Sequence, residues 1–286
     1  MEQGRLAVLV LCSALTVAGC AGKDTKTDVE RAIEGVNVIE ESNLGDIMLT
    51  VADPEEAVAY FTRAVREKPD RIDLQRGLAK SLVRARHAEE AVKVWKRVLA
   101  HPDATDEDRV DYAEALIRTG DWERAEATLN AVPPTYETYK RYRLEAMVAD
   151  SNRDWERADA FYETAAGLTT KPAAVLNNWG YSKLTRGAYE DAERLFLQAI
   201  KEDPSVFTAK NNLVLARAAQ RKYSLPPIPM TQVERAQLLH TMALAAIKQG
   251  DINTGKTLLE EAIETHPQHF EAAVRALRAL ESSPSL

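Results

Sequence analysis

The chain contains 286 residues, of which 45% are hydrophobic and 28% are charged, a balance typical of a folded globular protein. Its formal net charge of −7 argues against a general nucleic-acid binder, because neutralising phosphates requires a concentrated basic face. Aromatic residues are few, and glycine and proline number twelve each, which favours helix over sheet. We therefore expect no nucleic-acid partner.

The first residues of the chain are predicted to form a targeting segment. Arg5 precedes an apolar run from Leu6 to Ala18, which is too short to span a bilayer and suits the core of a secretion signal. The run ends in VAGC, which resembles the bacterial lipobox: a branched apolar residue and two small residues before a cysteine. In that family of signals the peptide is cut before the cysteine, whose thiol carries a diacylglycerol. The resemblance makes Cys20 the lipidated residue.

The cysteine count agrees with this interpretation. Cys12 would leave with the signal, so the mature chain would keep only Cys20 and could form no disulfide. We assign residues 1–19 to a removed signal peptide and residues 20–37 to a lipidated polar tether. Ala21 follows the cysteine, which by resemblance to Gram-negative lipoproteins favours the periplasmic face of the outer membrane. The alternatives are an ordinary signal peptide with an incidental cysteine, or a cytosolic chain with an apolar start.

A pattern with a period of about 34 residues runs through the rest of the chain. A small residue recurs in six segments, and a large apolar residue follows four positions later. The small residues are Ala57, Ala91, Ala125, Ala158, Ala192 and Gly255, and the large ones are Phe61, Trp95, Leu129, Tyr162, Phe196 and Leu259. The pattern resembles the tetratricopeptide repeat, and the segment 173–206 carries Trp179, Gly180 and Pro204 at that family's spacings.

The resemblance predicts an all-α fold, a right-handed superhelical solenoid of paired helices that stack to bury their apolar faces. We expect about six full repeats, at about 38–71, 72–105, 106–138, 139–172, 173–206 and 236–269. Five of them fill residues 38–206, and the final repeat with a C-terminal capping helix fills 236–286. Gly120, Gly187 and Gly250 should end the first helix of their repeats in a left-handed conformation. Trp122, Trp155 and Tyr189 follow that turn and are interpreted as wedges between repeats.

Residues 207–235 interrupt the period. FTAKNNLVLARAAQRK predicts the first helix of a repeat, and KYSLPPIPMTQ then replaces the second, because proline removes a backbone donor and clashes with the preceding turn. This degenerate repeat would leave an apolar flank covered only by extended chain or open to a partner. The candidate partner-binding residues of the break are Leu225, Pro226, Pro227, Ile228 and Pro229.

The same region resembles the tight-adherence pilus assembly lipoproteins, the TadD family, in NNWGYSKLTRG and in the block from FTAKNN to AIKQGD. The resemblance implies a lipidated outer-membrane protein that helps to assemble the Flp-type (type IVb) pilus. The implied role is pilotin-like, helping the secretin reach or multimerise in the outer membrane. Of the family's functional residues, only Cys20 is carried over.

The sequence lacks the motifs that catalysis and metal binding need. No HExxH, phosphate-binding glycine loop, nucleophile elbow or CxxC is present. His266 and His269 are three residues apart, but Pro267 lies between them and no further ligand completes a set. We therefore predict that the chain is not an enzyme, and we expect no cofactor, metal or small-molecule substrate.

With catalysis and metal binding not predicted, the remaining class of function is the recognition of a protein partner. In this architecture the first helices line a groove with positions 2, 5, 6 and 9 of each repeat. These positions hold Asn-Asn in two consecutive repeats, and paired amides can hold the backbone of an extended peptide. The candidate groove residues are Asn177, Asn178 and Tyr181 beside Ala174, and Asn211, Asn212 and Leu215 beside Thr208. Lys140 and Arg143 could add charge for an acidic group or a C-terminal carboxylate. Alternatively, these asparagines are exposed helix residues bonded to neighbouring turns.

Two functions are compatible with these features. The first is a lipid-anchored scaffold that binds a pilus secretin or other pilus components. The alternative is a lipidated periplasmic adaptor that recruits or regulates a protease or a peptidoglycan enzyme. Both the groove and the proline break are candidate interfaces.

Overall fold

The computed structural model describes residues 44–282. The predicted signal peptide, Cys20 and the tether lie outside the described residues. The described residues belong to two separate units, divided between Ala52 and Asp53. In the first unit, residues 44–50 are helical.

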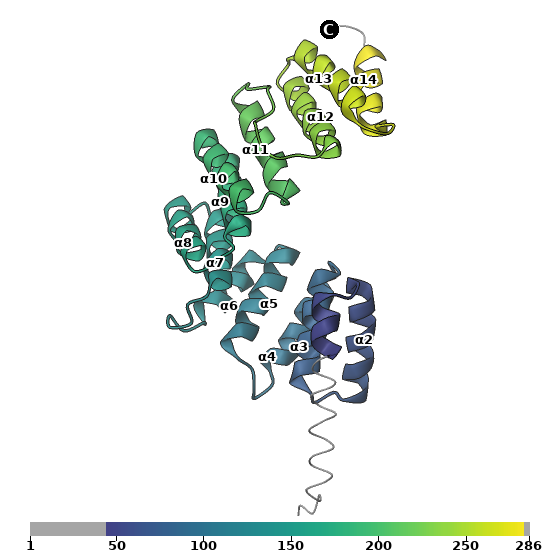
Figure 1. The fold of residues 1–286 in the computed structure, drawn as a ribbon. Helices are drawn as coiled ribbons and strands as arrows, with labels where there is room; N and C mark the ends of the chain where they lie inside the picture. The colour runs from purple at the N-terminus through teal and green to yellow at the C-terminus, as the bar shows by residue number, and fades with distance from the viewer. Residues whose placement is uncertain (1–43, 283–286) are drawn as a thin grey trace, which may run out of the picture. The chain divides into compact units, whose positions relative to one another are not determined.

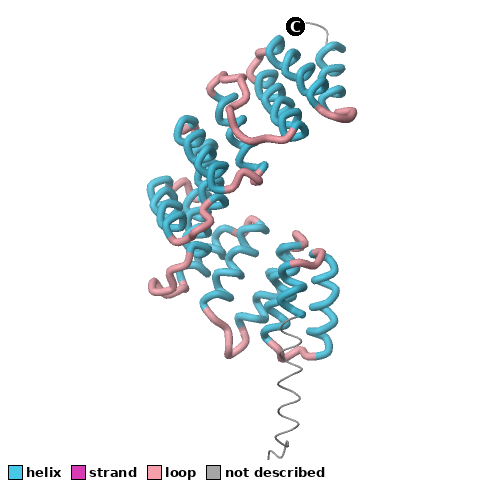
Figure 2. Tube along the Cα trace, in the orientation of Figure 1, coloured by secondary structure: helices cyan, strands magenta, loops and turns pink. Residues whose placement is uncertain are grey.

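The second unit is built from helices joined by short turns, and no strand occurs within residues 53–282 (Figure 2). This agrees with the predicted all-α class. The helices are α2 (Pro54–Glu67), α3 (Ile72–Arg84), α4 (Ala88–Leu99), α5 (Asp106–Thr119), α6 (Trp122–Asn130), α7 (Tyr139–Ser151), α8 (Trp155–Gly167), α9 (Ala173–Thr185), α10 (Tyr189–Glu202), α11 (Phe207–Ala219), α12 (Gln232–Lys248), α13 (Ile252–Thr265) and α14 (Glu271–Ser282).

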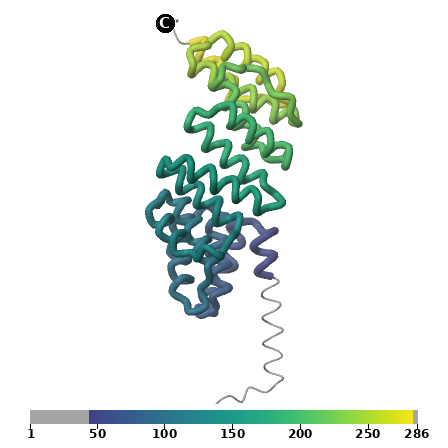
Figure 3. Tube along the Cα trace, turned by 90° about the vertical axis from the view of Figure 1, so that its left-hand side faces the viewer, coloured from purple at the N-terminus to yellow at the C-terminus, as the bar shows by residue number. Residues whose placement is uncertain are grey.

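Each helix of this unit packs against the next one along the chain (Figures 1 and 3). The helices α3, α5, α7, α9 and α11 also contact one another in series, whereas among the described helices the intervening α4, α6, α8 and α10 show no contacts of this extent. We call the contacting series the inner row. Because helices of the inner row lie closer to one another than α4, α6, α8 and α10 do, their side chains can form contacts between neighbouring repeats.

The core lies where paired helices cross. Ala192 is fully buried and Phe196 lies four residues later on the same face of α10. The ring of Phe196 packs on the backbone of α9 at Gly180, where an added Cβ would come within 2.6 Å of a ring carbon. Phe61 packs in the same way on Gly77 of α3. Gly180 and Gly77 are therefore small because a phenylalanine ring occupies the space beside each of them.

The turns after the first helices use a left-handed residue, as predicted. Gly120, Gly187 and Gly250 have φ of 79°, 83° and 83°. The sequence did not indicate that arginine takes this place in the other repeats, where Arg86, Arg153 and Arg221 have φ of 66°, 59° and 59°. The turn geometry is thus common to the repeats from residue 72 onwards, the degenerate one included, although glycine is not.

The proline break is extended chain between α11 and α12, and it covers the apolar flank left by the missing helix. Pro226 is buried, and Ile228 packs on the cluster formed by α9, α10 and α11. Leu225, with Tyr223 and Met230, packs on the cluster of α11 to α14. Three of the five predicted partner-binding residues therefore face the protein itself, whereas Pro227 and Pro229 are exposed.

The helix after the break begins earlier than the predicted repeat boundary at residue 236. α12 begins at Gln232, because Thr231 and Glu234 form a reciprocal capping box that satisfies its first backbone donors. At the other end of the unit, α14 occupies the position of the predicted capping helix and packs on α13.

The packing at Gly180 predicts the effect of a single methyl group. Gly180→Ala should lower the free energy of unfolding by about 1–2 kcal/mol, because Phe196 must move and this outweighs the better helix propensity of alanine. Gly167→Ala is the matched control: an added Cβ there meets nothing within 4 Å, so stability should stay constant or rise by up to about 1 kcal/mol. Urea unfolding measures both. Equal effects of the two substitutions would contradict the packing argument.

Candidate functional site

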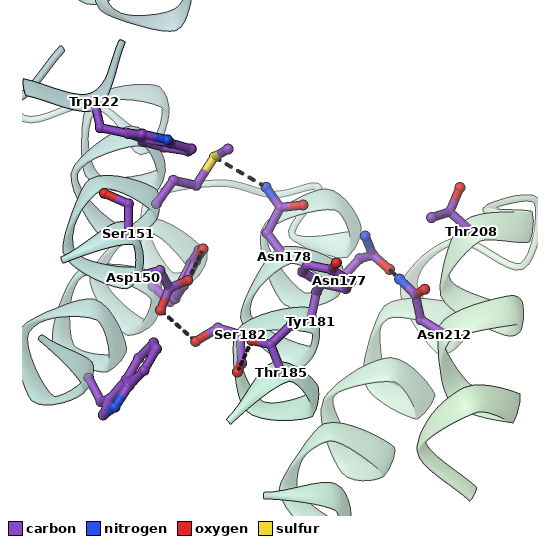
Figure 4. Close-up of a pocket in the computed structure, with 13 residues that line it drawn as sticks. Trp122, Asp150, Ser151, Asn177, Asn178, Tyr181, Ser182, Thr185, Thr208 and Asn212 are labelled. Carbon is purple, nitrogen blue, oxygen red and sulfur yellow. Dashed lines mark hydrogen bonds between the residues drawn. The ribbon is translucent and has the colours of Figure 1, made fainter. Parts of the chain in front are cut away.

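A pocket of about 470 Å³ opens on the inner row between α7 and α9 (Figure 4). This volume lies within the range of small ligand pockets. Its walls are mostly apolar and aromatic. The lining residues are Trp122, Met147, Asp150, Ser151, Trp155, Tyr162, Asn177, Asn178, Tyr181, Ser182, Thr185, Thr208 and Asn212.

Four of the predicted groove residues line this pocket, namely Asn177, Asn178, Tyr181 and Asn212. Thr208 lines it as well, and Tyr181 is 54% exposed at its edge. The remaining predicted residues, Lys140, Arg143, Asn211 and Leu215, lie elsewhere on the inner row. The structure therefore brings together the asparagines of two repeats but not the predicted cations.

The asparagines also bond to neighbouring side chains. Asn212 Nδ2 donates to Asn177 Oδ1 at 3.1 Å, and Thr241 Oγ1 donates to Asn211 Oδ1 at 2.8 Å. Asn178 Nδ2 lies 3.8 Å from the sulfur of Met147 (Figure 4). Within the described residues, the Nδ2 of Asn177 and the Oδ1 of Asn212 have no hydrogen-bond partner. One donor and one acceptor thus remain for a bound backbone.

Lys140 and Arg143 are neutralised inside the protein, which corrects the expectation that they offer free charge. Lys140 Nζ lies 2.5 Å from Asp111 Oδ1 and 2.6 Å from Glu114 Oε2. Arg143 Nη2 lies 3.8 Å from Glu114 Oε1. Sequence reasoning missed these pairs because each joins helices about 30 residues apart, and only the crossing of α5 and α7 brings them together.

Asp150, in the last turn of α7, carries the carboxylate of the pocket. Its Oδ1 accepts a hydrogen bond from Ser182 Oγ at 2.6 Å, and its Oδ2 accepts one from Tyr162 Oη at 2.9 Å (Figure 4). No cationic side chain of the described residues forms an ion pair with it. Burial raises the pKa of Asp150 above its usual value, because desolvation disfavours the charged form and exceeds the combined effect of the two hydroxyl donors and of the more distant Arg186 charge.

Asp159 on α8 shows the opposite arrangement. It accepts from Trp179 Nε1 at 2.6 Å and pairs with Lys183 Nζ at 2.8 Å and Arg186 Nη2 at 2.5 Å. Although desolvation opposes ionisation, these donors hold the pKa of Asp159 below its usual range. Arg186 therefore pairs directly with Asp159 and acts on the Asp150 carboxylate only from a longer distance, without an ion pair.

Trp122 and Trp155 are half-buried and line the pocket from the start of α6 and of α8. They were interpreted as wedges between repeats, and the structure shows that part of each ring also borders open space. Arg186 lies over the ring of Trp155, 5.5 Å from its centroid. The sequence showed the tryptophan pattern, but it did not show that Trp122 and Trp155 line the same pocket as Asp150. The one available signal was an aspartate in the last turn of a helix, where the helix dipole disfavours negative charge.

Comparison with known proteins identifies the repeats. Two family models described as tetratricopeptide repeats match the chain, one over residues 76–139 and 177–225 and the other over residues 238–269, together about half of its length. The chain belongs to the tetratricopeptide-repeat family. Tetratricopeptide solenoids are typically non-catalytic scaffolds that bind other proteins.

Solved structures share the tetratricopeptide fold at low identity. A tetratricopeptide repeat protein from Parabacteroides merdae is 15% identical, with a TM-score of 0.53, and the match covers 88% of this chain and 98% of that one. The Cut9-Hcn1 hetero-tetramer of APC/C is 13% identical, with a TM-score of 0.57 over 80% of this chain and 46% of that chain. Human IFIT1 dimer bound to PPP-AAAA is 13% identical, with a TM-score of 0.56 over 79% and 59%.

This chain thus spans less than two thirds of the matched Cut9-Hcn1 and IFIT1 chains. These likenesses establish the fold alone. No curated protein matches the sequence significantly.

Two further properties concern the described residues only. None of the helices within residues 44–282 combines the length and the apolar character needed to cross a bilayer. In the same part of the chain, no group of three or more His, Cys, Asp or Glu side chains converges in a way that could hold a metal ion.

The network around Glu114 predicts a pH-dependent stability. Despite its burial, Lys140, Arg118 and Arg143 lower the pKa of Glu114 from 4.5 to about 2. Because the folded pKa lies below the unfolded one, the stabilisation is complete above pH 4.5 and is lost as the pH falls towards 2. Glu114→Gln should therefore cost about 2–3 kcal/mol of unfolding free energy at pH 7 and roughly half of that at pH 3.

Urea unfolding of both proteins at the two pH values measures this difference. Glu163→Gln is the control, because Glu163 is exposed on α8 and should change stability by less than about 0.5 kcal/mol at either pH. A Glu114→Gln penalty that does not decrease towards acid pH would contradict the assigned network.

Proposed function

We propose that this protein is a lipid-anchored scaffold that holds an extended segment of a partner protein across α7, α9 and α11. The observation that carries the proposal is the pocket on the inner row together with the paired asparagines beside it. An extended chain lying there meets the amide donor of Asn177 and the amide acceptor of Asn212, which suit backbone groups of any sequence. Membership of the tetratricopeptide-repeat family supports protein binding as the general activity.

The proposed location rests on the sequence. Cys20 in VAGC is the acceptor of the lipid, and Ala21 after it favours the outer membrane, with the solenoid on the periplasmic face. Two or three acyl chains on one cysteine give stable anchoring, whereas a single chain gives only marginal binding. The tether of residues 20–37, treated as a flexible chain, reaches on the order of 20 Å from the membrane surface.

The proposed partner is the secretin, or another component, of an Flp-type (type IVb) pilus. The support is the resemblance of residues 177–187 and 207–251 to the TadD lipoproteins. A scaffold without catalytic residues suits such an assembly role, because it need only hold a partner at the membrane. The competing adaptor function, recruitment of a protease or a peptidoglycan enzyme, would use the same groove.

The decisive test follows the secretin of the same pilus system on gels of outer-membrane fractions. Deletion of the gene should remove the heat-resistant multimer or shift it to the inner membrane, and Cys20→Ser should fail to restore it because the scaffold is no longer anchored. A multimer that is unchanged on deletion would overturn the pilotin-like role. Co-purification of a hydrolase instead of pilus components would then support the adaptor function.

The groove is tested separately by binding. The double variant Asn177→Ala with Asn212→Ala should weaken the affinity for secretin peptides about tenfold, because two polar contacts of about 0.5–1.5 kcal/mol each are lost. Gln198→Ala, an exposed amide on the opposite helix α10, should leave the affinity unchanged. Titration of labelled peptides measures both, and an unchanged affinity of the double variant would exclude this groove.

A further inference from the structure

The pocket combines three features that a purely structural cavity does not need. It has aromatic walls from Trp122, Trp155 and Tyr181, it is open to solvent beside Tyr181, and its one carboxylate, Asp150, has no cationic partner. Figure 4 shows Asp150 on α7 hydrogen-bonded to Ser182 on α9, with Trp122 on the same side as Asp150 and Tyr181 on the side of α9. The arrangement is a negatively charged cavity bordered by rings.

The Asp150 carboxylate is held in place, but no cationic side chain of the described residues forms an ion pair with it. Each oxygen accepts one hydroxyl hydrogen, from Ser182 and from Tyr162, so each oxygen retains accepting capacity. The charged groups nearby are Arg186 and Asp159, and they pair with each other, so Arg186 acts on Asp150 only from a longer distance. The pKa of Asp150 is raised because its desolvation outweighs the two hydroxyl donors and this distant charge.

The rings favour the same kind of ligand. Aromatic faces attract a guanidinium or ammonium group through the ring quadrupole, and tryptophan does so most strongly. The protein itself uses this contact: Arg186 lies over Trp155 at 5.5 Å, and Arg157 lies over Phe161 at 5.2 Å. A second cation entering the pocket would meet both a ring and a free carboxylate.

Other occupants fit less well. A carboxylate would be repelled by Asp150. An apolar side chain would displace the water around Asp150 and offer no hydrogen-bond donor in its place. Such a loss of hydration is unfavourable for a charged carboxylate. A guanidinium presents parallel N–H groups that match the one remaining position on each oxygen, whereas an ammonium acts as a point charge.

We propose that this pocket takes a basic side chain, arginine in preference to lysine, from the extended partner segment, with Asp150 as its counter-charge and Trp122 and Trp155 as its walls. The inference rests on the proposed function, because the groove asparagines would hold the backbone that presents this side chain. It makes the site a specificity determinant: the asparagines accept any sequence, and the pocket selects a basic residue.

The test uses purified protein and a series of short capped peptides, Gly-Ser-Xaa-Ser-Gly, in which Xaa is Arg, Lys, Gln or norleucine. Binding is followed through the indole N–H resonances of the four tryptophans. The Arg peptide should shift the resonances of Trp122 and Trp155 and leave that of Trp95, which is fully buried on α4, in place. The Gln and norleucine peptides should bind at least about tenfold more weakly.

Two variants separate the role of the charge from that of the fold. Asp150→Asn should remove the preference for Arg over Gln. Its stability at neutral pH should not decrease, because a group whose pKa is raised on folding loses stability on ionisation. Glu193→Gln is the matched control: it breaks the pairs of Glu193 with Arg217 and Lys222, outside the pocket, so the protein should become less stable while the preference for Arg is retained.

The outcomes are distinct. An Arg preference that survives Asp150→Asn, or shifts confined to other tryptophans, would overturn the proposal, as would an absence of Arg-peptide binding at millimolar concentration. Free arginine amide binding as tightly as the Arg peptide would indicate a small-molecule amine site and overturn the peptide assignment. If the wild-type protein shows no preference for Arg but deletion of its gene still removes the secretin multimer, only this inference fails. If the wild-type protein prefers Arg but the deletion leaves the multimer unchanged, only the pilus role fails.

Discussion

The close crossing of the two helices within each repeat is the constraint on which the rest of this structure depends. At α9 and α10 the ring of Phe196 lies against the backbone of Gly180, so any side chain at that position would push the helices apart. A similar contact joins two neighbouring repeats, where Phe61 of α2 lies against Gly77 of α3. Because paired helices lie this close, successive first helices also contact one another, and the inner row follows from that contact.

The inner row then decides which charges are compensated. Polar residues of the inner row face a neighbouring repeat and can form ion pairs with it, as Lys140 does with Asp111 and Glu114. Asp150 and Asp159 lie near the same arginine, but Arg186 pairs with Asp159. The difference between a structural ion pair and a carboxylate available to a ligand is thus set by the position of one side chain between two helices. This is the physical basis of the site proposed at Asp150.

The proline break shows how a missing helix is accommodated. Extended chain cannot supply a continuous apolar face. Even so, Ile228 packs on the cluster of α9, α10 and α11, and Leu225 packs on the cluster of α11 to α14. Lys210 of α11, only 3% exposed, is paired with Glu234 of α12 at 2.9 Å and joins the two sides of the break. The solenoid therefore remains packed through the interruption, and the break contributes fewer exposed apolar groups to partner binding than its sequence alone indicates.

The sequence by itself determined the repeat period, the all-α class, the position of the break and the glycine turns, because these follow from local rules: a small residue four positions before a large one, a proline without a donor, and a glycine at positive φ. The tertiary structure alone decided which polar residues of the inner row are paired. Asn177 and Asn212 are 35 residues apart and meet in space, and Lys140 is neutralised by a helix two elements earlier. Such contacts depend on how neighbouring repeats cross, and no pattern within one repeat encodes that crossing. For the same reason the sequence indicated the tryptophans and the asparagines of the site but not the uncompensated carboxylate between them.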